Sequence, residues 1–158
     1  MKQTTNIVTI LLILFSITLS VAQTIKVKKG KVLYNKQEVA MVVKPYRNHF
    51  VFSNLQGDKQ FKLQLESISQ NENNIYQYLI LTNAEETITT EIPYEILITS
   101  LKTERIIAYL LAKKYKLINE KGIDKEALKV FFAKERESLS TKYTAIVAKE
   151  TAQENTRQ

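Results

Sequence analysis

Apolar and polar side chains alternate along the segment between residues 24 and 99. Phe61, Leu63 and Leu65 are separated by polar residues, so in an extended chain the apolar side chains lie on one face and the polar ones on the other. This two-residue period predicts a half-buried strand. Similar runs recur along the segment and predict further strands at residues 32–34, 39–43, 50–52, 75–82, 87–92 and 94–98.

Turn residues separate these runs. Asn35-Lys36-Gln37 predicts a hairpin, because Asn tolerates the left-handed backbone that a tight turn needs. Pro45 is expected to interrupt the pattern, since it has no N–H to donate to a strand ladder. Residues 54–58 are expected to form a turn and residues 69–74 a solvated loop. Because no helical segment lies between consecutive runs, we expect antiparallel pairing.

After Thr99 the apolar period changes from two residues to three or four. This change predicts a helix over residues 103–115, with its apolar side chains on one stripe. Residues 117–123 are expected to form a connection, and Asp124 to cap a second helix. We expect the two helices to contact Phe61, Leu63 and Leu65 through Ile107, Leu110, Leu111, Leu128, Phe131 and Phe132.

The pattern as a whole predicts an α+β fold. We expect an antiparallel sheet of about six or seven strands, followed by two C-terminal helices packed on one face. Residues 23–137 have a length that suits a single α+β domain with one core. Residues 138–158 are expected to be a helical extension or a frayed C-terminal tail.

The first twenty-two residues have the pattern of a cleavable export signal. Lys2 precedes an apolar run over residues 7–19, and Ser20-Val21-Ala22 places small residues before a cut between Ala22 and Gln23. The alternative is an uncleaved membrane anchor, but a spanning helix needs about 20 apolar residues, and Thr and Ser interrupt this shorter run. We therefore expect an exported protein, periplasmic or secreted, with no transmembrane segment after cleavage.

Charge is unevenly distributed along the chain, whose formal net charge is +7. Residues 23–47 contain seven basic side chains and one acidic one, residues 48–95 are acidic in balance, and residues 96–158 are basic. One interpretation is that these blocks attract each other within the domain, and the other is an anion-binding face on the first block. Its candidate residues are Lys26, Lys28, Lys29, Lys31, Lys44 and Arg47, with Lys26, Lys28 and Lys44 expected to project to one side of their strands.

Few side chains offer catalytic chemistry. His49 is the only histidine and is interpreted as an ordinary polar strand residue rather than a catalytic one. Without cysteine the chain has no disulfide, and with a single histidine it lacks the usual zinc ligand sets, so no metal site is expected. Three separated glycines form neither a phosphate-binding loop nor a dinucleotide fingerprint, so no cofactor is expected.

Two groups of residues have a functional alternative beside a structural interpretation. Glu85, Glu86 and Glu91 offer the paired carboxylates of a glycoside hydrolase, although side chains that flank a turn are more often solvated charges. An aromatic set offers a sugar-binding face, although aromatic residues in strands usually belong to the core or to cross-strand pairs. The set consists of Tyr34, Phe50, Phe52, Tyr76, Tyr78 and Tyr94.

Three segments, residues 21–28, 31–40 and 50–57, resemble those of small uncharacterised exported proteins of Bacteroidota. The similarity consists of a cleavage region, a hairpin and a strand that ends in a turn. It implies a location and a shape, and it implies no activity and no functional residues.

Together these patterns predict an exported, non-enzymatic protein that binds a partner protein or an anionic component of the cell envelope. Nucleic acid is not an expected partner outside the cytoplasm. The alternative function is that of a hydrolase with a carboxylate-based site.

Overall fold

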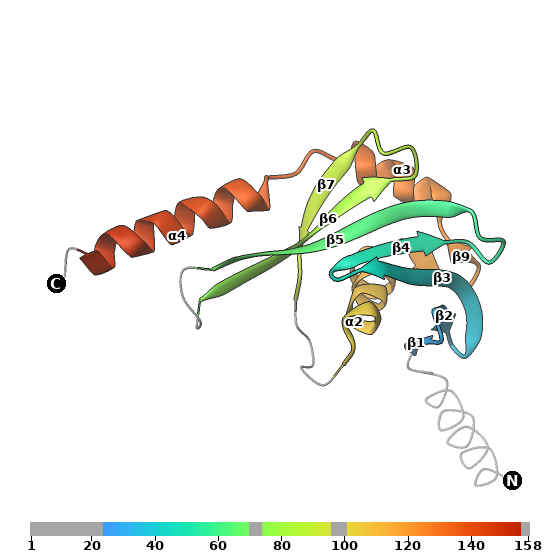
Figure 1. The fold of residues 1–158 in the computed structure, drawn as a ribbon. Helices are drawn as coiled ribbons and strands as arrows, with labels where there is room; N and C mark the ends of the chain where they lie inside the picture. The colour runs from blue at the N-terminus through green and yellow to red at the C-terminus, as the bar shows by residue number, and fades with distance from the viewer. Residues whose placement is uncertain (1–23, 70–73, 96–100, 156–158) are drawn as a thin grey trace, which may run out of the picture.

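The computed structural model describes residues 24–69, 74–95 and 101–155 (Figure 1). Seven strands form one antiparallel sheet in which each strand pairs with the next along the chain, which confirms the predicted strand order and pairing. The sheet is curved, with its two edges formed by the first and last strands. The strands are β1 (Ile25–Lys28), β2 (Lys31–Tyr34), β3 (Gln37–Tyr46), β4 (His49–Ser53), β5 (Lys59–Ser69), β6 (Ile75–Asn83) and β7 (Thr89–Pro93).

Helices follow the sheet, as the change of period predicts, and the α+β class is confirmed. The first helix, α2 (Thr103–Tyr109), continues directly into a π-helical turn, η1 (Leu110–Lys114). The segment predicted as a plain connection contains a small hairpin of β8 (Ile118–Asn119) and β9 (Gly122–Ile123). Two further helices complete the described chain, α3 (Lys125–Ala133) and α4 (Leu139–Asn155).

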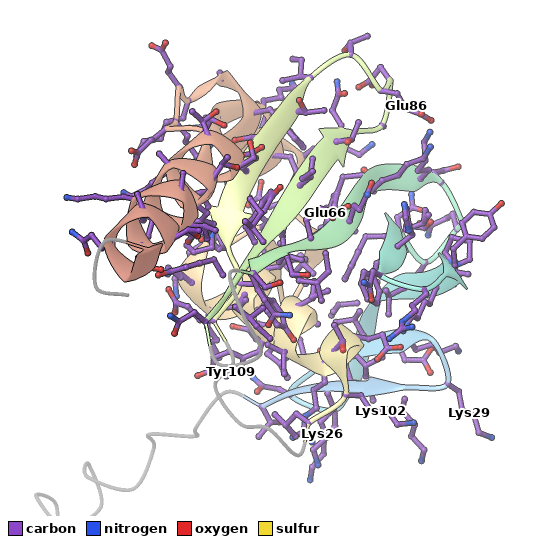
Figure 2. All side chains as sticks on the ribbon, turned by 60° about the vertical axis from the view of Figure 1, so that its left-hand side comes forward. Lys26, Lys29, Glu66, Glu86, Lys102 and Tyr109 are labelled. Carbon is purple, nitrogen blue, oxygen red and sulfur yellow. The ribbon has the colours of Figure 1, made fainter. Side chains whose placement is uncertain are left out.

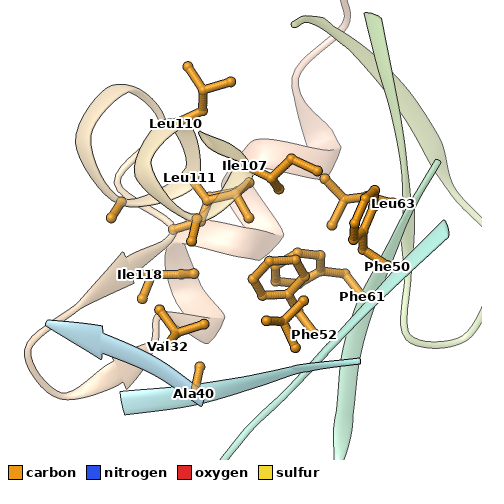
Figure 3. Packing of buried hydrophobic residues seen from close by; sticks show 14 of the residues in the cluster. Val32, Ala40, Phe50, Phe52, Phe61, Leu63, Ile107, Leu110, Leu111 and Ile118 are labelled. Carbon is orange, nitrogen blue, oxygen red and sulfur yellow. The ribbon is translucent and has the colours of Figure 1, made fainter. Parts of the chain in front are cut away.

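The core lies between one face of the sheet and α2, η1 and α3. Phe50 and Phe52 of β4 and Phe61 of β5 are fully buried and meet Ile107 and Leu111 across the layer (Figure 3). Leu128 and Phe131 of α3 join the same cluster. Phe132 was expected to be buried as well, but it is only half-buried at the edge of the cluster.

The turn between β2 and β3 and the start of α3 lie where the sequence predicts them. Asn35 and Lys36 both have positive φ, 49° and 72°, and Tyr34 pairs with Gln37, so they form the two-residue turn between β2 and β3. At the start of α3 the Asp124 side chain accepts a hydrogen bond from the Ala127 backbone N–H, 2.9 Å away, which is the predicted cap.

Two strand boundaries differ from the expectation. Pro45 does not end the strand, because β3 continues to Tyr46 with a register shift that leaves the proline outside the β3–β4 ladder. Tyr94 and Glu95 are not in a strand, since β7 ends at Pro93. The rest of the predicted strand at 94–98 lies outside the described residues.

The third helix, α4, packs on the opposite face of the sheet from α2 and α3. Tyr76 and Tyr78 of β6 alternate with the core residue Leu79, so the two tyrosines point to the outer face. The ring of Tyr143 in α4 lies 5.2 Å from that of Tyr76 and 6.0 Å from that of Tyr78. The predicted two-layer arrangement therefore holds for α2 and α3, and α4 adds a partial third layer.

The predicted export signal, with its cut between Ala22 and Gln23, lies outside the described residues. None of the helices in the described ranges is long and apolar enough to cross a membrane.

Candidate anion-binding site

A groove of about 560 Å³ lies between β1, β3 and the start of α2. Its basic side chains are Lys29, from the β1–β2 turn, Lys44, from β3, Lys102, immediately before α2, and Arg105, from the first turn of α2. Glu104 is the one acidic side chain among the lining residues described. The groove therefore joins two basic segments that are more than fifty residues apart in the sequence.

The β1–β2 turn holds Lys29 at the rim of the groove. Lys29 and Gly30 both have positive φ, 51° and 76°, and together they make a two-residue turn. The Gly30 carbonyl accepts a hydrogen bond from the Val42 backbone N–H at 2.7 Å, which ties the turn to β3. A Cβ at Gly30 would lie 3.2 Å from the Val42 carbonyl oxygen, so this close approach favours glycine.

The start of α2 supplies the opposite wall of the groove. The Lys102 carbonyl accepts hydrogen bonds from the backbone N–H groups of Arg105 and Ile106, at 2.9 and 3.2 Å, and so begins the helix. Leu101 packs against the core just before it, while the helix contacts β1. These contacts place Lys102 and Arg105 across from the β1–β2 turn.

The groove has an excess of positive charge. Its four cationic side chains and one carboxylate give a formal charge of +3. Within the described ranges, none of the ion pairs joins Lys29, Lys44, Lys102 or Arg105 to a carboxylate. Lys44 contacts the ring of Phe50, with its ammonium 5.4 Å from the ring centroid. The cations therefore remain able to bind an external anion.

The structure separates the predicted basic residues into two groups. Lys26 and Lys28 are exposed and alternate with the inward-facing Ile25, so they point to the outer face. Lys44 lies on the core side, over Phe50, so the expectation that it shares a side with Lys26 and Lys28 is wrong. A register shift lies just beyond Val43 in β3. The face on which the lysines of one strand lie does not predict the face on which a lysine of another strand lies.

The other predicted basic residues lie outside the groove. Lys31 forms an ion pair with Glu38 at 2.6 Å, which offsets its charge. Arg47 is exposed in the β3–β4 turn, where its carbonyl accepts a hydrogen bond from His49 Nδ1 at 3.0 Å. The His49 ring also meets Tyr46 edge-on at 6.0 Å between centroids. These contacts fit the interpretation of His49 as an ordinary strand residue.

Glu86 of the proposed hydrolase pair is held as an anion. Lys62 and Lys59 donate hydrogen bonds to its Oε1 at 2.6 and 2.9 Å. These hydrogen bonds, together with the positive charges, lower the pKa of Glu86 to about 2. A general acid for glycoside hydrolysis needs a raised pKa, so Glu86 does not suit that role.

Glu91 is engaged at the start of α4. Its partial burial alone would raise its pKa, but hydrogen bonds from residues 138–140 outweigh burial and hold the pKa of Glu91 below its usual range. The Ser140 backbone N–H donates to one oxygen at 2.9 Å and the Ser140 hydroxyl to the other at 2.8 Å. Glu91 thus caps the helix, and its charge favours the helix N-terminus.

The predicted aromatic set does not form one exposed face. Tyr34, Phe50 and Phe52 are buried in the core, and Tyr78 is buried on the opposite face. Tyr76 lies beside Tyr78 and donates a hydrogen bond from its hydroxyl to Glu150 of α4 at 3.1 Å. The alternative interpretation, in which strand aromatics belong to the core and to local pairs, accounts for these positions.

The sequence analysis missed Lys102 and Arg105 as candidate site residues. Arg105 lies in the predicted first helix and Lys102 immediately before it, where charged side chains off the apolar stripe are expected to face solvent. The contact between α2 and β1 brings them to the β1–β2 turn. The signal available from the sequence was their charge at the start of a helix, where cations are unfavourable for the helix dipole.

Within the described residues no cluster of three or more His, Asp or Glu side chains is arranged to hold a metal ion. Comparisons of the chain with protein-family models, with curated proteins and with solved structures give no match. The function proposed below therefore rests on the sequence and on the geometry of the basic groove.

Proposed function

We propose that this chain is an exported, non-enzymatic protein that binds an anionic component of the cell envelope. The observation that carries the proposal is the groove between the β1–β2 turn and α2, which is lined by Lys29, Lys44, Lys102 and Arg105 and by one acidic side chain. Cations gathered in a concave surface concentrate the electrostatic field and attract anions.

The basic surface extends beyond the groove. Lys26 and Lys28 on the edge strand are exposed, and Figure 2 shows Lys26, Lys29 and Lys102 pointing outward along the same margin of the protein. We call the six residues Lys26, Lys28, Lys29, Lys44, Lys102 and Arg105 the basic margin. Each basic residue close to an anionic membrane surface contributes about 1 kcal/mol of attraction, so several together support peripheral binding.

The carboxylates of the alternative hydrolase function take part in structural contacts. Glu86 is ion-paired with two lysines, and Glu91 caps α4, so both have structural partners. Their lowered pKa values keep them ionised at neutral pH. The chemistry that distinguishes the basic margin is therefore its positive charge.

Export is tested by the N-terminus of the mature protein. Because signal peptidase cuts after a small residue that follows the apolar run, we expect the mature chain to begin at Gln23. Intact-mass measurement of the protein recovered from cells identifies this end. A mass that corresponds to the uncut chain in the soluble cytoplasmic fraction would contradict export.

Binding is tested with the mature chain and vesicles that contain phosphatidylglycerol. We expect sedimentation with these vesicles at low salt and loss of binding towards 1 M salt, because the Debye length falls from about 10 Å at 0.1 M to about 3 Å at 1 M. Lys26→Gln combined with Lys28→Gln removes two charges and is expected to weaken binding about 30-fold, from about 1 kcal/mol for each lysine.

The matched control is Lys149→Gln. Lys149 is exposed in α4, which contacts β5, β6 and β7, and its replacement changes the net charge by one unit without touching the basic margin. Vesicle affinity is expected to stay unchanged in this variant. Because the control removes one charge and the double variant two, a free-energy loss in the control half as large as that in the double variant would show that net charge, not the basic margin, governs binding.

A further inference from the structure

The basic groove also has aliphatic walls. Val27 of β1, Val42 of β3 and Leu101 before α2 line it together with the cations. Its volume of about 560 Å³ lies within the range of about 300–1,000 Å³ that is typical of sites for small molecules. The groove is therefore suited to one compact group with a charged part and an apolar part, rather than to an extended polymer.

The charge of the groove indicates which anion suits it. Four cations against Glu104 leave a formal charge of +3. A phosphate monoester carries about −1.5 to −2 charges at neutral pH, whereas a phosphate diester carries a single negative charge. The guanidinium of Arg105 can donate two parallel hydrogen bonds to phosphate oxygens, and the lysines act as point charges. A doubly charged phosphate thus matches the groove better than a diester does.

The aliphatic walls indicate the source of the phosphate. A free phosphate ion is hydrated on all sides and gains nothing from contact with Val27, Val42 and Leu101. A phosphate that is attached to a glycerol or sugar with acyl chains brings apolar surface, and burying that surface is favourable. Lys29 and Lys102 line the groove, and Figure 2 shows them on the same margin of the protein as the exposed Lys26.

We propose that the groove binds the phosphomonoester headgroup of an anionic membrane lipid. The phosphate lies between Lys44, Lys102 and Arg105, and the first apolar part of the lipid lies against the aliphatic walls. This inference rests on the function proposed above and specifies its ligand.

The test compares two kinds of vesicle at equal surface charge, matched by electrophoretic mobility. One kind contains phosphatidic acid, a phosphomonoester, and the other contains phosphatidylglycerol, a diester. We expect the mature chain to bind the phosphatidic acid vesicles about tenfold more tightly, a difference of about 1.4 kcal/mol. In the variant with Lys44→Gln and Arg105→Gln, we expect the two affinities to become equal.

Two further measurements separate this site from general electrostatics. The Lys26→Gln, Lys28→Gln variant is expected to bind both kinds of vesicle more weakly while it keeps the tenfold preference, because these lysines lie outside the groove. Glycerol 3-phosphate at a concentration equal to that of the lipid phosphate, which has the phosphate without acyl chains, is expected not to displace the vesicles. Circular dichroism spectra check that each variant is folded.

The outcomes are distinguishable from those of the proposed function. Absence of binding to any anionic vesicle at low salt would contradict both proposals. Equal binding to the two kinds of vesicle by the natural sequence, or a preference that survives Lys44→Gln and Arg105→Gln, would overturn the headgroup site while leaving anionic binding in place. Full displacement by glycerol 3-phosphate would assign the groove to a free phosphate ester instead of a lipid.

Discussion

Replacing Phe52 with alanine is expected to lower the free energy of unfolding by about 3–5 kcal/mol. Phe52 in β4 is fully buried, and its ring stacks on that of Phe61 in β5 with 5.1 Å between centroids. Alanine removes most of the side chain and leaves a cavity at the centre of the layer between the sheet and the helices (Figure 3). Urea denaturation of the mature chain, followed by circular dichroism, measures the loss.

Val130→Ala is the control for this core substitution. Val130 lies in α3 and is 70% exposed, so its replacement is expected to change the free energy of unfolding by less than about 0.5 kcal/mol. Phe52→Leu keeps an apolar side chain and is expected to fall between the two. A loss below about 1 kcal/mol for Phe52→Ala would contradict the packing of β4 against α2 and α3.

The strands and their faces follow from the sequence because the signal is local and repeated. In β5 the apolar residues Phe61, Leu63 and Leu65 are buried while their polar neighbours are not, as alternation requires. The same holds for the turn at Asn35, whose positive φ suits the residue type. Where one face of a strand must be buried, the register is fixed because a shift by one residue would move every apolar side chain to the solvent face.

The second face of the sheet could not be predicted from this alternation. Tyr76 and Tyr78 are residues of a type that is common in strands, and nothing near them in the sequence shows that α4 covers them. The helix itself has apolar and polar residues spread around its circumference, so it has no strong stripe that would indicate a buried side. Its position depends on Glu91, a cap supplied by a residue 49 positions away from Ser140.

The candidate site was predictable only where its residues form a local pattern in the sequence. The positive charge of the first hairpin is visible in the sequence, and Lys29 and Lys44 do line the groove. Lys102 and Arg105 line the groove because α2 contacts β1, and these two elements are far apart in the sequence. A single sequence carries no signal for such a contact. The spacing of apolar residues that predicts a strand or a helix depends only on that element's own residues, not on the element that it contacts.

Replacing Gly122 with alanine is expected to cost about 2–5 kcal/mol. Gly122 in β9 has φ +122°, a backbone conformation that side chains with a Cβ rarely adopt. An added Cβ would also lie 3.2 Å from the carbonyl oxygen of Val39 in β3, which is part of the sheet and cannot move freely. The β8–β9 hairpin would have to shift away from β3, and its displacement would weaken the start of α3.

Gly57→Ala separates the two causes of this loss. Gly57 also has positive φ, +95°, but the nearest atom to an added Cβ is the end of the Met41 side chain at 3.9 Å. Its replacement is therefore expected to cost only the backbone strain, about 1–3 kcal/mol, in the same urea denaturation experiment. A larger loss at Gly122 than at Gly57 assigns the difference to the close approach of β9 to β3. Equal losses would mean that the hairpin yields to the added methyl group, so that backbone conformation alone explains glycine at both positions.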